Sequence, residues 1–366
     1  MIRYLTRKEK ERSRALYEAC FPEDGKAFVD YYYREKVQDN QILVMEEAGD
    51  IQVMVHLNPF RFSICKAENL VHYVVAVATE ASVRRQGKMA EVLHHALKDL
   101  AGTGEPFAFL IPANPEVYVS SGFSYVPCET YGELGRRLSE CAMAAERGMQ
   151  DVLPMVHRSV PDLQAAELGA EDEGFILRKA TAEDIPSMVS FANEQMARVY
   201  DVFPLRDAAY YERMFLELES QDGGLLLLEQ EDEEEPSGII SYGRDGDSIQ
   251  LQELLILPEF AAELPGHLEK YFSGSRLVIT KMQFMVRILD IRALVNFMRC
   301  REPFSLKVKV KDGLLSNNCG SFMITAGPEG GGIREIQEAE VKCEMDISEL
   351  TAFLFRRLRL FIREWV

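Results

Sequence analysis

The sequence predicts an α/β (α+β) protein with two similar mixed sheets, each carrying helices, and a small third α+β domain. Three observations predict this fold. A strand, a basic turn with a glycine and an amphipathic helix follow one another over residues 75–100. The order of elements before that unit returns after residue 175, and the pattern changes again at residue 282. A chain of 366 residues has room for such an arrangement. We therefore expect domains at 1–150, 151–281 and 282–366.

Composition narrows the classes of function. Apolar residues make up 47% of the chain, which is enough for real cores, and the formal net charge is −18. An acidic surface repels phosphate backbones, so nucleic acid is not expected as a partner, whereas cationic amines are weakly attracted. No apolar run reaches the ~18 residues of a membrane span, and the charged start does not resemble a signal peptide. A cytoplasmic location and no membrane partner are expected.

The cysteine content also favours a cytoplasmic location. There are seven, which is an odd number, and they are scattered without a Cys-x-x-Cys pair. This usage is typical of a reducing cytoplasm and indicates neither a disulfide framework nor structural zinc. No metal is expected. His94 and His95 lie together on a predicted helix, where a solvated face is the simpler interpretation than a metal site.

The chain is organised around residues 75–90. The run Val75–Thr79 is apolar and β-branched, as in a buried strand. A short basic turn follows, and then a helix with one apolar face. Unpaired N–H groups and a partial positive charge make a helix N-terminus an anion site. The turn therefore suits a diphosphate, although an ordinary turn with surface arginines would look similar.

A second stretch follows at a short distance. Residues 107–114 read as another buried strand and a turn, and Tyr118, Gly122 and Phe123 come next. Tyr118 is the candidate functional residue of this stretch. The alternative is a half-buried tyrosine whose hydroxyl is satisfied by a neighbour.

Around these stretches, the first domain reads as a strand at 2–5, helices at 8–20 and 28–33, and a hairpin formed by 42–47 and 51–57. The aromatic residues at 28–33 are expected in the core rather than in a substrate cleft. Residues 131–170 read as a helical connection.

The later elements repeat and then depart from this order. The second domain is predicted to contain a strand at 175–180, a helix to residue 196, a hairpin of 225–230 and 238–242, and a central strand at 251–257. Pro258 follows that strand in place of a basic glycine turn, so this copy should lack the diphosphate site. The third domain is predicted to have a helix at 290–299, strands at 304–310, 321–324 and 340–345, and a final helix from 347. Gly330–Gly332 is expected to form a mobile hairpin rather than a phosphate cradle.

Two of these motifs resemble those of a known family. Arg84-x-x-Gly87-x-Met89 resembles the acyl-CoA pyrophosphate loop of the GNAT N-acetyltransferases, and Tyr118-x-x-x-Gly122-Phe123 resembles their tyrosine motif. Met89 stands where the family usually has Gly or Ala, and in the Eis-like (enhanced intracellular survival) branch a larger apolar residue also occupies this position. Residues 285–290 resemble that branch's connection to a sterol-carrier-like domain. The resemblance is specific at 75–90 and 107–126 and architectural elsewhere.

The resemblance implies a role for particular residues. Acetyl-CoA would be the co-substrate, with its pantetheine along the backbone of Val77, Ala78 and Thr79. Tyr118 would protonate the departing thiolate, and the carboxylate of Val366 would serve as the base toward an amine that is mostly protonated at neutral pH. The diphosphate and the remaining cofactor contacts would fall to Arg84, Arg85, Gln86, Gly87, Lys88, Met89, Ala90 and Asn114.

We therefore expect an acetyl-CoA-dependent N-acetyltransferase that acts on a primary amine of a small molecule or peptide. Two alternatives stay open: a non-catalytic protein that binds or senses acyl-CoA, and a carrier of hydrophobic ligands that acts through residues 282–366. The sequence does not name the amine, and it leaves a homo-oligomer open.

Overall fold

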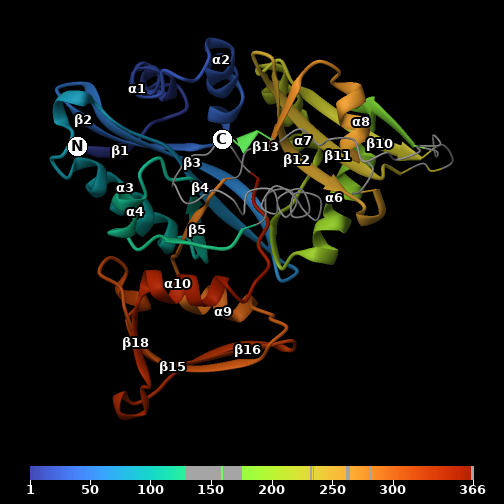
Figure 1. Ribbon diagram of the computed structural model, residues 1–366. Helices are drawn as coiled ribbons and strands as arrows, with labels where there is room; N and C mark the ends of the chain where they lie inside the picture. The colour runs from blue at the N-terminus through green and yellow to red at the C-terminus, as the bar shows by residue number, and fades with distance from the viewer. Residues whose placement is uncertain are drawn as a thin grey trace, which may run out of the picture.

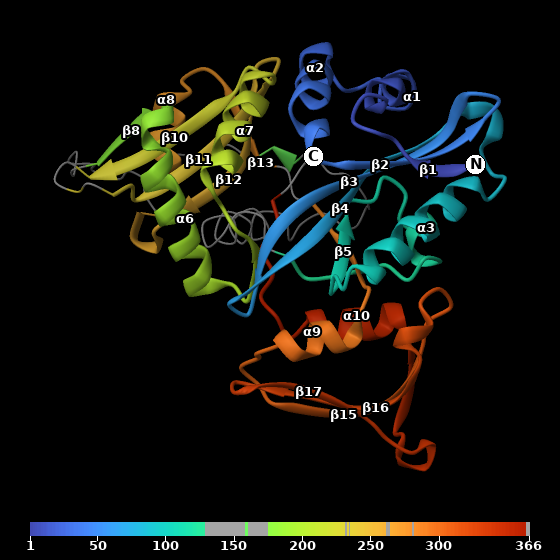
Figure 2. The same ribbon diagram turned by 180° about the vertical axis from the view of Figure 1, so that it is seen from behind.

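A computed structural model describes residues 1–128, 158–159, 175–230, 233, 235–260, 264–279 and 282–363. Three sheets organise these residues, and Figures 1 and 2 show them as three bodies seen from opposite sides. The prediction of a mixed α/β fold is confirmed. Of the predicted connection at 131–170, all but residues 158–159 lies outside the described residues.

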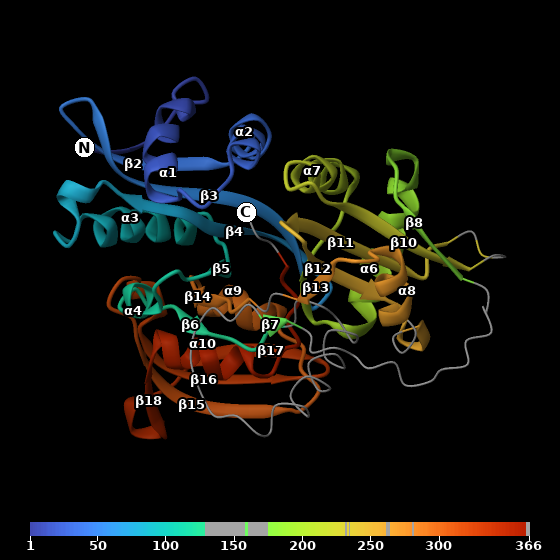
Figure 3. The same cartoon turned by 45° about the horizontal axis from the view of Figure 1, so that its top comes forward.

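The first sheet has eight strands in the order β1-β2-β3-β4-β5-β14-β6, with β9 paired to β3. Helices α1 and α2 cover one face and α3 the other, as Figure 3 shows. The strands are β1 Ile2–Tyr4, β2 Gln41–Glu47, β3 Asp50–Ile64, β4 Ala67–Thr79, β5 Phe107–Leu110, β6 Ser124–Tyr125, β9 Val202–Pro204 and β14 Met285–Ile288. The helices are η1 Lys10–Ser13, α1 Arg14–Cys20, α2 Lys26–Arg34, η2 Lys36–Gln38, η3 Ala81–Val83, α3 Lys88–Gly102 and α4 Pro115–Val119.

Apolar spacing explains how these helices are held. The buried residues of α3 are Val92, Leu93, Ala96, Leu97 and Leu100, which form one stripe against the sheet. On the opposite face, Tyr31, Tyr32 and Tyr33 of α2 are at most 4% exposed, which confirms the core interpretation of this aromatic cluster.

The strand β14 changes the predicted domain division. It pairs antiparallel with β5 through Met285–Ile288 and also with β6. Residues that the sequence assigned to the third domain therefore complete the first sheet. This strand follows the boundary expected at residue 282 and yet lies in the first sheet, because its side chains are buried in the core of that sheet.

The second sheet has the strand order β7-β13-β12-β11-β10-β8. The predicted hairpin appears as β10 and β11, joined antiparallel. The strands are β7 Arg158–Ser159, β8 Phe175–Lys179, β10 Gly224–Gln230, β11 Gly238–Asp245, β12 Ser248–Ile256 and β13 Arg276–Ile279. The helices are η4 Ala182–Asp184, α6 Ile185–Val199, α7 Ala208–Glu219, η5 Pro258–Phe260 and α8 Leu264–Tyr271.

The third sheet has four strands in the order β17-β16-β15-β18. Gly330–Gly332 lies in a hairpin, as expected: it begins β17, which pairs antiparallel with β16 directly after the turn. Glycine is required at Gly331, because a Cβ there would lie 1.9 Å from the carbonyl oxygen of Val295 on the covering helix. The strands are β15 Phe304–Lys311, β16 Gly320–Gly327, β17 Gly330–Glu335 and β18 Cys343–Asp346. The helices are α9 Ile291–Phe297, η6 Ser316–Asn318, η7 Glu338–Glu340 and α10 Ile347–Phe355.

The segment after α10 returns to the other two bodies. Leu360 forms a parallel bridge with Val202, and the Phe361 N–H donates to the Val202 carbonyl oxygen at 2.9 Å. Phe361 is buried in the core of the second domain, whereas Ile362 is buried in that of the first. Within the described residues, no helix combines the length and the apolar character needed to cross a membrane.

Candidate functional site

The centre of the candidate site is the place where β4 and β5 part. These parallel strands pair at Tyr73 and Phe109, whose rings stack with their centroids 5.0 Å apart. Beyond that pair, β4 runs on to Thr79 while β5 ends at Leu110. The backbone of Val77, Ala78 and Thr79 therefore has no partner from β5, and an extended ligand can pair with it as an added strand would.

A β-bulge lies in the same part of β4. The register with β3 shifts between Met54 and His56, where β4 carries an extra residue, and Ala76 has a φ of 48°. A bulge leaves backbone groups unpaired and redirects them, and bulges are frequent next to active sites. A backbone N–H released there is suited to an oxyanion.

The predicted phosphate turn leads directly into α3. Gly87 is the N-cap of this helix and has a φ of 80°, and Arg85 has a φ of 62°. Arg84, Arg85, Gln86 and Gly87 are exposed, and Met89 and Ala90 lie half-buried in the first helical turn. Because α3 is 15 residues long, its N–H groups and dipole face the exposed turn, which is the geometry of an anion site.

Some side chains of the turn serve its own structure. Arg84 Nε donates to the Thr79 carbonyl oxygen at 2.9 Å and so ties the turn to the end of β4. Lys88 Nζ lies 2.8 Å from Glu47 Oε1, and Gln86 Nε2 donates weakly to the Ser82 carbonyl oxygen at 3.4 Å. Arg85 forms no such contact within the described residues, so its guanidinium is the freest cation of the turn.

Tyr118 lies on α4, which follows β5. Its hydroxyl makes no hydrogen bond to a described residue. The alternative interpretation, in which a neighbouring group bonds this hydroxyl, therefore has no support among the described residues. Burial raises the pKa of Tyr118 to about 12, so the hydroxyl keeps its proton at neutral pH. Asn114, predicted to contact the cofactor, is the N-cap of α4 and accepts from the Glu116 N–H at 3.3 Å.

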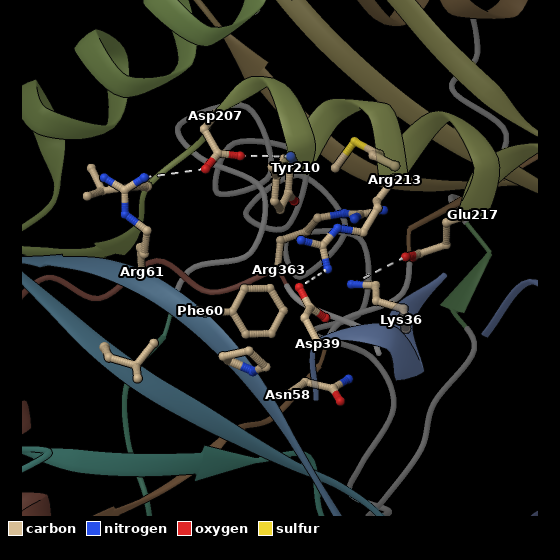
Figure 4. Close-up of a pocket in the computed structure, with 14 residues that line it drawn as sticks. Lys36, Asp39, Asn58, Phe60, Arg61, Asp207, Tyr210, Arg213, Glu217 and Arg363 are labelled. Atoms are coloured by element: carbon tan, nitrogen blue, oxygen red, sulfur yellow. Dashed lines mark hydrogen bonds and ion pairs between the residues drawn. The ribbon is translucent and has the colours of Figure 1, made fainter. Parts of the chain in front are cut away.

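A cavity of about 280 Å³ opens between the first two domains, beside this site. One wall is β3 with the segment around η2, and the other is α7 (Figure 4). Asn58 in this wall is the β3 residue that pairs with Tyr73, the point where β4 and β5 part. The cavity thus adjoins β4 and β5 at the point where these two strands part.

Three ion pairs join the two domains at this cavity, and Figure 4 shows them. Arg213 lies 2.7 Å from Asp39, Arg61 lies 3.4 Å from Asp207, and Lys36 lies 3.8 Å from Glu217. These residues could not be identified from the sequence, because they meet only when the domains pack. The helix α7 could have been found, since Asp207 caps it and Tyr211, Met214 and Leu218 have helical spacing.

His94 does not lie on a solvated face: it is half-buried, and its Nε2 is 3.0 Å from Ser121 Oγ, since α3 packs against the end of α4. Val366 lies outside the described residues. Arg363, the last residue described, lines the cavity, and its guanidinium donates to Gln252 Oε1.

Comparison with known proteins indicates the class of protein to which this geometry corresponds. Residues 1–126 match the family model described as "Acetyltransferase (GNAT) domain". The first part of the chain is therefore a GNAT acetyltransferase domain, and acyl transfer is the general reaction that this supports. A comparison with curated proteins found no match.

Solved structures resemble the whole chain in fold. A probable N-acyltransferase from Enterococcus faecalis has a TM-score of 0.70 at 12% identity, over 98% of this chain and 93% of that chain. A GCN5-related N-acetyltransferase from Kribbella flavida has 0.70 at 11%, over 100% of both chains. Eis1 from Mycobacterium abscessus has 0.64 at 15%, over 96% of this chain and 88% of that chain.

Proposed function

We propose that the protein is an acetyl-CoA-dependent N-acetyltransferase of the Eis-like type, with a primary amine as acceptor. The observation that carries this proposal is the parting of β4 and β5 at a bulge, followed along the chain by a left-handed glycine turn and by a tyrosine whose hydroxyl has no partner among the described residues. Each feature supplies a different requirement of acyl transfer from a thioester.

Binding would begin at the turn. The N–H groups that open α3 and the cations of Arg84, Arg85 and Lys88 would hold the diphosphate, and the free edge of Val77–Thr79 would pair with the two amides of pantetheine. The acyl carbonyl would then lie near the bulge, where a backbone N–H can stabilise the developing oxyanion.

The acceptor amine would enter from the cavity between the domains. It must lose a proton to attack the carbonyl, and the carboxylate of Val366 is our candidate for the base. Val366 follows Arg363 by three positions, a reach of about 10 Å, so this carboxylate can lie within the same cavity. Tyr118 would donate its proton to the leaving thiolate as the tetrahedral centre collapses.

The proposal is tested by following free CoA thiol. The protein is incubated with acetyl-CoA and each of a panel of amines: a polyamine, lysine, an aminoglycoside and a peptide N-terminus. We expect thiol release that depends on one class of amine and that Gly87→Asp abolishes, because its carboxylate would repel the diphosphate. Binding of acetyl-CoA without release by any amine would instead support the non-catalytic acyl-CoA-binding alternative.

The carrier alternative has less support. The inner face of the third sheet, which would line a ligand cavity, is filled by residues at most 2% exposed. They are Val308, Val310, Phe322 and Ile324 from the sheet and Leu350, Leu354 and Phe355 from α10. The sterol-carrier-like nature of this domain stays a prediction, and a native mass showing a retained apolar ligand would favour it.

A further inference from the structure

A buried arginine joins the third domain to the helix that carries Tyr118. Arg287 lies on β14 and is 1% exposed. Its Nη2 is 2.8 and 2.9 Å from the two carboxylate oxygens of Asp312, which follows β15. Its Nη1 donates to the carbonyl oxygen of Ser121 at 2.5 Å. The guanidinium thus contacts the third domain with one nitrogen and the end of α4 with the other.

The contact at Ser121 supports the backbone of Tyr118. The N–H groups of Ser121 and Phe123 both donate to the carbonyl oxygen of Tyr118, at 3.0 and 3.2 Å. Gly122 between them has a φ of 82°, and a Cβ there would lie 1.7 Å from Arg287 Nη1. Arg287 therefore occupies the space that Gly122 leaves empty, and the glycine of the Tyr-x-x-x-Gly motif allows this approach.

Both partners of Arg287 are themselves fixed. Asp312 accepts from the N–H groups of Leu314 and Leu315 at 2.9 and 3.1 Å and from Asn318 Nδ2 at 3.0 Å. Ser121 is 2% exposed, and its hydroxyl contacts His94 on α3. A charge-assisted, bidentate pair held in this way is a rigid support.

We propose that Arg287, anchored by Asp312, is a positioning residue that holds Tyr118 in place for proton donation. Through it, the third domain takes part in the reaction although none of its strands reaches the parted β4 and β5. This inference rests on the proposed function, because it assigns a purpose to the position of Tyr118. The alternative is that the pair only fastens the domains together.

Arg287→Lys tests the proposal, because lysine keeps the charge but cannot contact Ser121 and both oxygens of Asp312 in one plane. We expect kcat to fall by about 10- to 100-fold, since misplacement by about 1 Å has such an effect, with KM for acetyl-CoA unchanged. Tyr118→Phe should then have a much smaller effect in the Arg287→Lys background than in the wild type, because the two residues act as a unit.

The matched control is Arg178→Met in the second domain. Arg178 also bridges two carboxylates, 2.7 Å from Asp184 and 2.6 Å from Glu229, but lies on β8 away from α4. It should leave kcat unchanged. If Arg287→Lys keeps kcat within twofold of the wild type, or if Tyr118→Phe has its full effect in that background, Arg287 only fastens the domains and the proposal is wrong.

A second measurement does not need activity. Hydrogen exchange of the amides of residues 117–123 should accelerate in Arg287→Lys and in the milder Asp312→Asn, and not in Arg178→Met. Accelerated exchange in a protein that transfers no acetyl group would count against the proposed function alone. Unchanged exchange in both variants would overturn the positioning role itself, and Asp312→Asn provides this result if Arg287→Lys does not fold.

Discussion

The hydroxyl of Tyr118 is the single group on which the proposed transfer step depends most. Tyr118→Phe removes the proton donor and keeps the ring, which packs edge-on against Phe123 with centroids 6.1 Å apart. We expect kcat to fall by ~10²–10⁴-fold while the Kd for acetyl-CoA is unchanged. Steady-state kinetics and calorimetry measure the two quantities.

Tyr125→Phe is the control for this substitution. Tyr125 lies nearby on β6 and is 41% exposed, so loss of its hydroxyl should change neither kcat nor binding. Full activity of Tyr118→Phe would show that solvent, rather than this residue, supplies the proton.

The buried imidazole of His56 makes stability depend on pH. His56 is fully buried, its Nδ1 lies 2.9 Å from the Tyr32 hydroxyl oxygen, and burial lowers its pKa to about 3. In the unfolded chain the pKa is ~6.5, so below that pH the unfolded state binds a proton that the folded state does not. The free energy of unfolding should therefore fall by about 2 kcal/mol between pH 7 and pH 5.

Urea unfolding at the two pH values measures this difference. His56→Gln removes the titrating group, so its stability should change less between pH 7 and pH 5 than that of the wild type, whatever its stability at pH 7. An equal pH dependence in both proteins would assign the effect to other groups.

At this scale, the sequence identified some residues of the site and necessarily missed others. Gly87 and Tyr118 stand in short motifs whose spacing can be read along the chain. Arg287 could be read only as a charged residue in an apolar run, because its two partners come from distant parts of the sequence. Whether such an arginine is buried and paired depends on tertiary packing.

The two ends of α3 differ in their expected function, although each has a glycine in the left-handed conformation. Gly87 at the N-terminus has a φ of 80° and Gly104 beyond the C-terminus a φ of 83°, and a Cβ would meet nothing within 4 Å at either. Alanine at either position should therefore lower stability by about 1 kcal/mol through backbone strain alone. Only Gly87→Ala should also weaken acetyl-CoA binding.

Calorimetric titration and thermal unfolding of the two variants separate these effects. Equal affinity in Gly87→Ala, Gly104→Ala and the wild type would contradict a diphosphate site at the start of α3.

Among the described residues of the second domain, no basic glycine turn leads into a long helix. Its β12 and β13 also pair in parallel over a short length, at Ser248–Leu251 and Arg276–Ile279. After β12, however, comes η5 with Pro258 and Glu259, and α8 has eight residues against the 15 of α3. Calorimetry should give one acetyl-CoA per chain, and a stoichiometry of two would refute the loss of this site.

Pairing between strands that follow one another in the sequence was predictable. Pairing between strands that lie far apart in the sequence was not. The hairpins β2–β3 and β10–β11 follow from alternating residues on either side of a turn. The strands β14 and β9 join the first sheet from later in the chain, and nothing in their short apolar runs specifies that partner. Partner choice is set by the free edges that the remainder of the fold provides.

At the scale of the whole molecule, the segment after α10 connects all three bodies. The N–H of Asp201 donates to the Arg359 carbonyl oxygen at 2.8 Å, and the Arg359 N–H donates to Asp201 Oδ2 at 2.8 Å. With Phe361 and Ile362 in two different cores, the path of the chain is fixed up to the cavity. The sequence predicted three domains but could not predict that they converge on one cavity, because the ion pairs there form between domains.

This fixed path leads to our last prediction, which concerns the carboxylate of Val366. Arg363, three positions earlier, lines the cavity. A few residues added after Val366 would convert its carboxylate to an amide. We expect such an extension to lower kcat by ~10²-fold or more, as for loss of an acid–base group, with the Kd for acetyl-CoA unchanged. The same residues added before Met1, which is 81% exposed, are the control and should have no effect. Val366→Ala keeps the carboxylate and should remain active. A C-terminally extended enzyme with full kcat would exclude the carboxylate as the base and direct attention to Asp39, Asp207 and Glu217 in the cavity wall.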